Sequence, residues 1–211
     1  MTDGSADVDV ARIATEALGP EVGLLAGVEA GGFAHSLGDV LVDLARNPAA
    51  LVAPTSRLAA ALAEGGLATV GRMWGLPFPG PMDANGDRRF RDPGWEHNPW
   101  FFGLRQWYLA WARYLPELVD AAAVDPPTAA KARFAVGLVV DGLAPTNFLW
   151  GNPEALQRAV DTGGESVLAG LRNFIHDVAT NGGKPSQVDA SAFRLGENLA
   201  ATPGKVVFRN E

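Results

Sequence analysis

Ser36 is the residue that comes nearest to a catalytic nucleophile in this sequence. It lies in the run AHSLG at 34–38, which shares part of the G-x-S-x-G pattern of hydrolases. That pattern works only where a buried strand delivers the serine to a sharp turn, and the preceding run GVEAGG is poor strand material. Ser36 and Asp39 instead have the spacing of a capping box. We predict that Ser36 caps a helix, and a small serine or carboxylate enzyme stays an alternative.

The sequence contains no pattern typical of a metal site, of cysteine chemistry or of a phosphate-binding loop. The three histidines, His35, His97 and His176, have no second ligand at a spacing typical of a metal site. The chain contains no cysteine, which excludes disulfides, thiolate metal sites and a cysteine nucleophile within it. The pair Gly163–Gly164 has no preceding strand and no lysine at the spacing of a phosphate-binding loop. We predict no catalytic, cofactor-binding or metal-binding residue.

The six tryptophans are the remaining chemically distinctive residues. Most aromatic residues at helical spacing belong to a core, and this is the simpler interpretation of most of them. Trp100 and Trp107, however, fall beside rather than on the main apolar stripe of their helix, which contains Trp111. The alternative is that Trp100, Trp107 and Trp111 form an exposed apolar surface for a partner or a hydrophobic particle.

Helix signals dominate the elements that must position these residues. Periodic apolar residues predict helices from Ser36 and from about Pro54 to Trp74, the second weakened by Gly65 and Gly66. Three Asx-Pro pairs predict helix starts, since the polar side chain caps the helix and proline needs no donor at the first position. The pairs are Asn98-Pro99, Asp125-Pro126 and Asn152-Pro153, and a fourth start has capping-box spacing at Thr162 and Glu165.

The first helix after residue 98 carries the longest apolar stripe. It consists of Phe101, Leu104, Tyr108, Trp111, Leu115, Leu118 and Ala122. Phe101, Leu104 and Trp111 are predicted core residues, and Pro116 predicts a kink or break near Leu115. Further helices are expected over 129–143, 153–161 and 165–180. Residues 205–208, KVVF, predict a short strand that lacks a partner.

Net charge and hydropathy exclude some classes of binding partner and indicate the cellular compartment of the protein. The formal charge is −7 and the pI about 5.0, which disfavours nucleic acid and anionic lipid as direct partners. The first thirty residues lack the basic start of a secretory signal, and no apolar run approaches the roughly 20 residues of a spanning helix. We expect a cytoplasmic protein with no transmembrane segment.

Three runs of the sequence resemble one protein family. They are DRRFRDPGWEHNPWFF at 87–102, TNFLWGNPEALQRAVDTGGESVLAGLRNF at 146–174 and NLAATPGKVVFRNE at 198–211. Together they resemble the N-terminal region of the class I poly(3-hydroxyalkanoate) synthases. Composition and periodicity predict a flexible arm over 1–35, leading helices over 36–75 and a linker over 76–86, and the resemblance implies the family's helical domain over 87–211. The expected fold is mainly α, with a C-terminal strand leading into a missing α/β-hydrolase domain.

The resemblance implies a role in polyester biosynthesis. Those synthases polymerise (R)-3-hydroxyacyl-CoA units with a cysteine nucleophile in the domain that follows this region. No cysteine is present here, so no catalytic role carries over to any residue. We expect the N-terminal region alone, as a fragment or a truncated reading frame, acting in dimerisation, granule or partner contact and support of the catalytic domain. The alternative is an independent, phasin-like protein that coats polyester granules.

Overall fold

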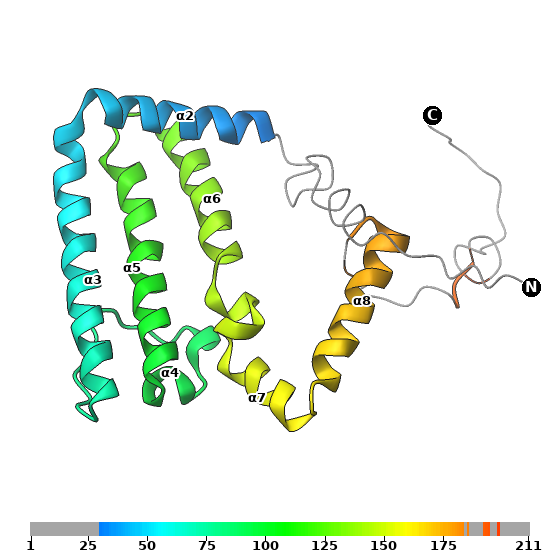
Figure 1. Ribbon diagram of the computed structural model, residues 1–211. Helices are drawn as coiled ribbons and strands as arrows, with labels where there is room; N and C mark the ends of the chain where they lie inside the picture. Colours follow the sequence, from blue (N-terminus) through cyan, green and yellow to red (C-terminus); the bar gives the residue numbers. More distant parts are fainter. Residues whose placement is uncertain (1–29, 184, 186–191, 195–197, 199–211) are drawn as a thin grey trace, which may run out of the picture. The chain divides into compact units, whose positions relative to one another are not determined.

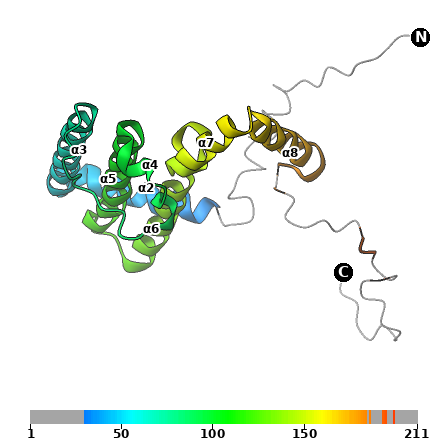
Figure 2. The same cartoon turned by 90° about the horizontal axis from the view of Figure 1, so that it is seen from below.

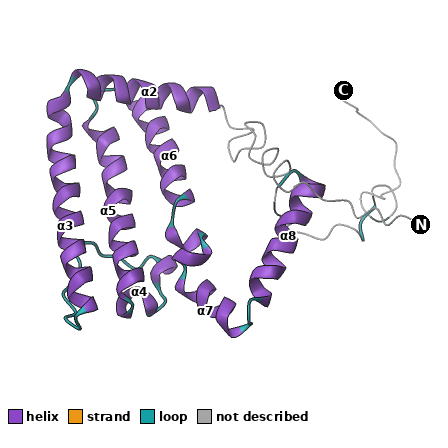
Figure 3. Cartoon of the chain, in the orientation of Figure 1, coloured by secondary structure: helices purple, strands orange, loops and turns teal. Residues whose placement is uncertain are grey.

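The computed structural model describes residues 30–183, 185, 192–194 and 198, and the described part of the chain is helical without a strand (Figure 3). Its α-helices are α2 (Ala30–Arg46), α3 (Val52–Met73), α4 (Gly94–His97), α5 (Pro99–Ala121), α6 (Pro126–Gly142), α7 (Pro153–Asp161) and α8 (Glu165–Asn181). Short 3₁₀ turns cover Pro48–Leu51, Arg88–Phe90, Pro145–Asn147 and Leu149–Gly151. The expected strand at 205–208 lies outside the described residues, as does most of the expected arm.

Helices α3, α5 and α6 run side by side in that order, and α2 crosses one end of the row (Figure 1). The short α4 packs against the other end of α5, as the view turned by 90° also shows (Figure 2). These helices belong to one compact unit, Leu24–Leu168, whose boundary falls inside α8. Helix α5 therefore has neighbours on two sides and holds the unit together.

The three Asx-Pro helix starts are confirmed. The side-chain oxygens of Asn98, Asp125 and Asn152 accept hydrogen bonds from the amides of Trp100, Thr128 and Ala155, at 2.9, 3.1 and 3.1 Å. In each case proline occupies the first helical position, so the local sequence sets the boundary.

Two of the predicted capping residues act differently. Ser36 lies inside α2, where its hydroxyl donates to the carbonyl of Gly32 at 3.0 Å, so the prediction that it begins the helix is wrong. Thr162 ends α7, and its hydroxyl accepts from the amide of Ser166 at 3.2 Å. Glu165 is then the first residue of α8 and not the third residue of a capping box. The first difference arises because α2 begins before the apolar pattern that starts at Ser36. The second arises because Gly163 and Gly164, both with positive φ, separate Thr162 from α8.

Helix α5 continues through Pro116, so a break near Leu115 is not found. Proline removes one backbone donor, but Pro116 lies near the helix end at Ala121, where Val119 packs in a cluster with α2 and α6. That cluster contains Val40, Leu44, Val119 and Ala132. Tertiary packing over this last stretch offsets the local penalty.

The core of the unit forms a second cluster where α4 meets α5. Trp95 is 1% exposed and lies edge-on to Phe90 and Phe101, with ring centroids 4.9 and 5.7 Å away. Tyr108 and Ala144 complete the buried set. The prediction of Phe101 as a core residue is confirmed, whereas Leu104 and Trp111 are half-buried.

Candidate functional site

The segment 76–86 has no regular secondary structure but is tied to the helices. The buried Gln106 side chain of α5 accepts from the amide of Met82 at 2.9 Å and donates to the carbonyl of Met82 at 2.8 Å. Arg72 at the end of α3 donates to the carbonyl of Phe78. Residues 76–86, expected as a linker, are thus anchored along the α3–α5 pair.

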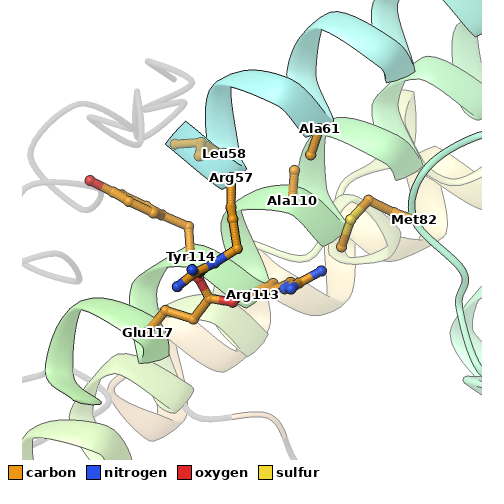
Figure 4. A pocket seen from close by; sticks show the side chains of 8 residues that line it. All are labelled: Arg57, Leu58, Ala61, Met82, Ala110, Arg113, Tyr114 and Glu117. Atoms are coloured by element: carbon orange, nitrogen blue, oxygen red, sulfur yellow. Dashed lines mark hydrogen bonds and ion pairs between the residues drawn. The ribbon is translucent and has the colours of Figure 1, made fainter. Parts of the chain in front are cut away.

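A small hollow between α3 and α5 holds a carboxylate between two guanidinium groups. Glu117 accepts from Arg57 at 3.0 Å and from Arg113 at 2.8 Å, and Figure 4 shows both arginines reaching toward it, with Met82 across the hollow. Burial favours the neutral acid, but the bonds from Arg113 and Arg57 outweigh it and lower the pKa of Glu117. A carboxylate held ionised in this way clamps two helices and is a poor proton donor.

Two further ionic clusters join segments that are distant in sequence. Arg105 is 7% exposed and donates to Glu96 at 2.7 Å, while its Nε finds no acceptor among the described residues. Arg72 lies over the ring of Phe102 at 3.3 Å and bonds the Glu96 carbonyl at 3.3 Å, and burial lowers the pKa of Arg72. Glu96 therefore links α4 to both α3 and α5.

Arg89 forms the other cluster. It donates to both carboxylate oxygens of Asp87, and it reaches Asp141 at 3.0 Å and the hydroxyl of Tyr108 at 3.2 Å. The hydrogen bond from Arg89 lowers the pKa of Asp87, whereas burial raises the pKa of Tyr108. The Tyr108 hydroxyl donates in turn to the carbonyl of Val140, so this cluster fixes α6 on α5.

The histidines and Ser36 do not form a catalytic site. His35 is exposed and pairs with Asp39 at 3.6 Å one helical turn away, and His97 and His176 are exposed on other helices. Ser36 is buried with its hydroxyl bonded inside its own helix, which contradicts the serine-nucleophile alternative. Within the described ranges, no three metal-ligating side chains lie together.

A larger groove lies on the α3–α5 pair. It has a volume of about 360 Å³ and is lined by Ala61, Leu62, Gly65, Gly66, Thr69, Val70, Gly103, Gln106 and Trp107. Gly65 faces Gln106 and Gly103 faces Thr69, so closely that an added Cβ would lie 3.2 Å and 2.9 Å from the opposing side chain. The sequence interpretation treated Gly65 and Gly66 only as helix-weakening residues. We call this nine-residue lining the glycine groove.

Two of the three candidate tryptophans meet beside this groove. Trp107 lines it and is 52% exposed, and the ring centroid of Trp111 lies 6.2 Å from that of Trp107. Trp111 also packs edge-on to Tyr114, and its ring nitrogen is buried without an acceptor among the described residues. Trp100, at 60% exposure, instead donates weakly to the carbonyl of Trp150 at 3.5 Å. Trp150 in turn stacks on Phe148. The sequence patterns did not predict the contact between Trp100 and Trp150.

Helix α8 carries a second exposed apolar surface. None of its residues is buried, and Val167, Leu168, Leu171, Phe174 and Ile175 recur at steps of one, three and four residues along one side of the helix. Such a stripe is typical of a helix that packs against something else. Within the residues that the structure describes, no helix is both long and apolar enough to cross a membrane.

Comparison with known proteins gives one consistent result. A family model described as "Poly-beta-hydroxybutyrate polymerase (PhaC) N-terminus" matches residues 86–211. The poly(3-hydroxyalkanoate) polymerase 1 of Ectopseudomonas oleovorans is 42% identical over 125 residues, which cover 59% of this chain and 22% of that protein. The poly(3-hydroxyalkanoate) polymerase subunit PhaC of Cupriavidus necator is 43% identical over 142 residues, which cover 66% of this chain and 24% of that protein.

A third relative extends the match slightly. The poly(3-hydroxyalkanoate) polymerase subunit PhaC of Rhizobium meliloti is 35% identical over 147 residues, covering 68% of this chain and 24% of that protein. The chain therefore spans less than a quarter of the length of each of these three relatives. No solved structure matches it.

Proposed function

Because the chain belongs to the poly-beta-hydroxybutyrate polymerase (PhaC) N-terminus family, we propose that it acts in polyester biosynthesis as the helical N-terminal region of a poly(3-hydroxyalkanoate) polymerase. In this role it supports acyl transfer that residues outside this chain perform. The relatives are polymerases, and the part that matches this chain is less than a quarter of their length. This share favours an auxiliary role for the matched region.

The exposed stripe of α8 is the observation that carries this proposal. Each large aliphatic or aromatic side chain moved from water into a packed interface contributes roughly 1.5–3 kcal/mol. Leu168, Leu171 and Phe174 are 54%, 52% and 56% exposed, so the helix retains much apolar area for such an interface. We propose that this stripe docks on the catalytic region of the polymerase.

Trp107 and Trp111 form the second proposed contact, and Trp100 with Trp150 forms a third. Tryptophan is enriched among residues that dominate binding energy, because its ring buries a large area at a small loss of side-chain freedom. We propose that these aromatic surfaces bind a second copy of the chain, a granule protein or the polyester surface. We expect the protein to act in the cytoplasm, at the granule surface.

A binding experiment tests the proposal. The chain is mixed with the part of the Cupriavidus necator polymerase that lies outside the matched segment, and complex formation is followed by size-exclusion chromatography. We expect a complex that Leu171→Glu in α8 weakens at least tenfold. Leu67→Glu on α3 is the control, since Leu67 is 71% exposed and does not line the glycine groove.

Two results would count against this function. One is the absence of any complex. The other is partition of the purified chain onto polyester granules with no polymerase present and no effect of Leu171→Glu, which would favour the independent granule-coating role.

A further inference from the structure

A corner of three residues joins α7 to α8. Helix α7 extends to Asp161 and α8 begins at Glu165, so only residues 162–164 lie between them. This corner and the first turn of α8 belong to the same compact unit as α7, Leu24–Leu168. None of the residues of α8 is buried, so packing of its side chains into a core does not orient the helix. The backbone of the corner therefore sets the direction in which α8 leaves α7.

Two glycines end α7 with the hydrogen bonds of a left-handed cap. The amide of Gly163 donates to the carbonyl of Val160 at 3.0 Å, and the amide of Gly164 donates to the carbonyl of Ala159 at 2.8 Å. The φ angles of Gly163 and Gly164 are 57° and 91°, in a region that residues with a Cβ rarely adopt. The glycines therefore give the corner one specific turn.

Thr162 contacts both helices through one hydroxyl group. The hydroxyl donates to the carbonyl of Arg158 in the last turn of α7 at 2.8 Å. The same oxygen accepts from the amide of Ser166 in the first turn of α8 at 3.2 Å, and the Ser166 hydroxyl lies 3.1 Å from it. One side chain therefore ties the end of α7 to the start of α8.

Every backbone amide from residue 162 to residue 168 has an acceptor within the corner or the end of α7. Besides the bonds given above, four amides donate at 3.1 Å, those of Thr162, Glu165, Val167 and Leu168. The first amides of a helix ordinarily lack partners in the chain, but those of α8 are satisfied. Rotation about the corner would leave several of these amides without a partner.

We propose that Thr162 is a positioning residue whose hydroxyl holds α8 in one direction from α7, so that the exposed stripe of α8 is oriented before it docks. A helix that sampled many directions would bind only from the competent fraction of its conformations, which slows association. The fixed corner does not depend on the proposed function, whereas its use in docking rests on that function.

Thr162→Val is the variant that tests the proposal, because valine matches threonine in shape but has no hydroxyl. Thr162→Ser keeps the hydroxyl and should restore the native behaviour. Thr180→Val is the matched control. The Thr180 hydroxyl also donates to a carbonyl four residues earlier, that of His176 at 2.7 Å, but this bond lies within α8.

Paired spin labels on Glu154→Cys and His176→Cys report the separation of the two helices in the free chain, and the lack of native cysteine keeps the labelling specific. We expect one narrow distance distribution for the native sequence, Thr162→Ser and Thr180→Val, and a broader one for Thr162→Val. A broad distribution in the native sequence, or an unchanged one in Thr162→Val, overturns the proposal.

Circular dichroism separates positioning from helix stability. We expect equal helix content in Thr162→Val and in the native chain, because the hydroxyl orients α8 and the other bonds of the corner remain. A loss of helix content that accompanies the broader distribution would mean that the hydroxyl only stabilises α8, and it would overturn the positioning role.

Binding to the part of the Cupriavidus necator polymerase outside the matched segment tests the use in docking, measured by surface plasmon resonance. We expect Thr162→Val to associate about fivefold more slowly or worse and to dissociate at the native rate, because its stripe is intact. Thr162→Ser and Thr180→Val should associate like the native chain. Native association by Thr162→Val overturns the role in docking. Absence of any complex would overturn the proposed function instead, and the distance distributions would still decide whether the corner is fixed.

Discussion

The side-chain amide of Gln106 on α5 accepts a hydrogen bond from the N–H of Met82 and donates one to its C=O. These two hydrogen bonds fix segment 76–86 on the helices. Replacing Gln106 by Leu leaves the two Met82 groups without their partner. We predict that Gln106→Leu lowers the free energy of unfolding by about 1–3 kcal/mol, measured by urea denaturation. Gln157→Leu on the exposed surface of α7 is the control, and a loss of equal size there would contradict the interpretation.

Glu96 neutralises a guanidinium that is otherwise buried. Arg105 is only 7% exposed, while Glu96 is 54% exposed, so the pair is worth less than a fully buried one. We predict that Glu96→Gln destabilises the protein by about 2 kcal/mol, because Arg105 loses its charged partner. Glu154→Gln removes the exposed pair with Arg91 at 3.8 Å and should cost less than about 1 kcal/mol. Equal effects in thermal unfolding would show that burial of Arg105 is unimportant.

Asn98 sets the start of α5 through a single local bond. We predict that Asn98→Ala destabilises the protein by about 1 kcal/mol and that Asn98→Asp is close to neutral, because aspartate caps equally well. Chemical denaturation with an unchanged m-value is the measurement. A similar loss in both variants would mean that the Trp100 amide does not depend on this cap.

Local patterns of this kind were the most predictable part of the fold. The caps at Asn98, Asp125 and Asn152 need only neighbouring residues, and each was readable from two letters of sequence. Ser36 and Pro116 were misjudged because their outcome depends on how far the helix continues. The continuation is decided by packing with other helices, which short-range patterns do not contain.

The candidate site was less predictable, since it depends on the face that α5 turns toward α3. The patterns singled out neither Arg105 nor Gln106, yet both polar side chains are buried, with Glu96 and Met82 as their partners. Trp107, which the pattern put beside the main stripe, is 52% exposed. The glycine groove beside it could not be predicted, because it depends on the close approach of Gly65 to Gln106 and of Gly103 to Thr69.

Acid should weaken the protein through two carboxylates. The folded-state pKa values of Asp87 and Glu117 are lowered by bonds with arginine, so both groups add stability above their unfolded pKa of about 4. This contribution is lost as the pH falls through the lower folded values. We predict that a double variant, Asp87→Asn with Glu117→Gln, is less stable than the native chain at pH 7 but loses less stability between pH 7 and pH 3. Parallel stability curves for the two proteins would contradict these assignments.

The lag and rate of hydroxyacyl thioester consumption test the central claim most directly. The part of the Cupriavidus necator polymerase that lies outside the matched segment is assayed alone, with this chain, and with its Phe174→Glu variant. The account predicts that the native chain shortens the lag and raises the rate, and that Phe174→Glu, which disrupts the α8 stripe, restores the slow course. An unchanged lag with the native chain, or thioester consumption by this chain alone, would contradict it.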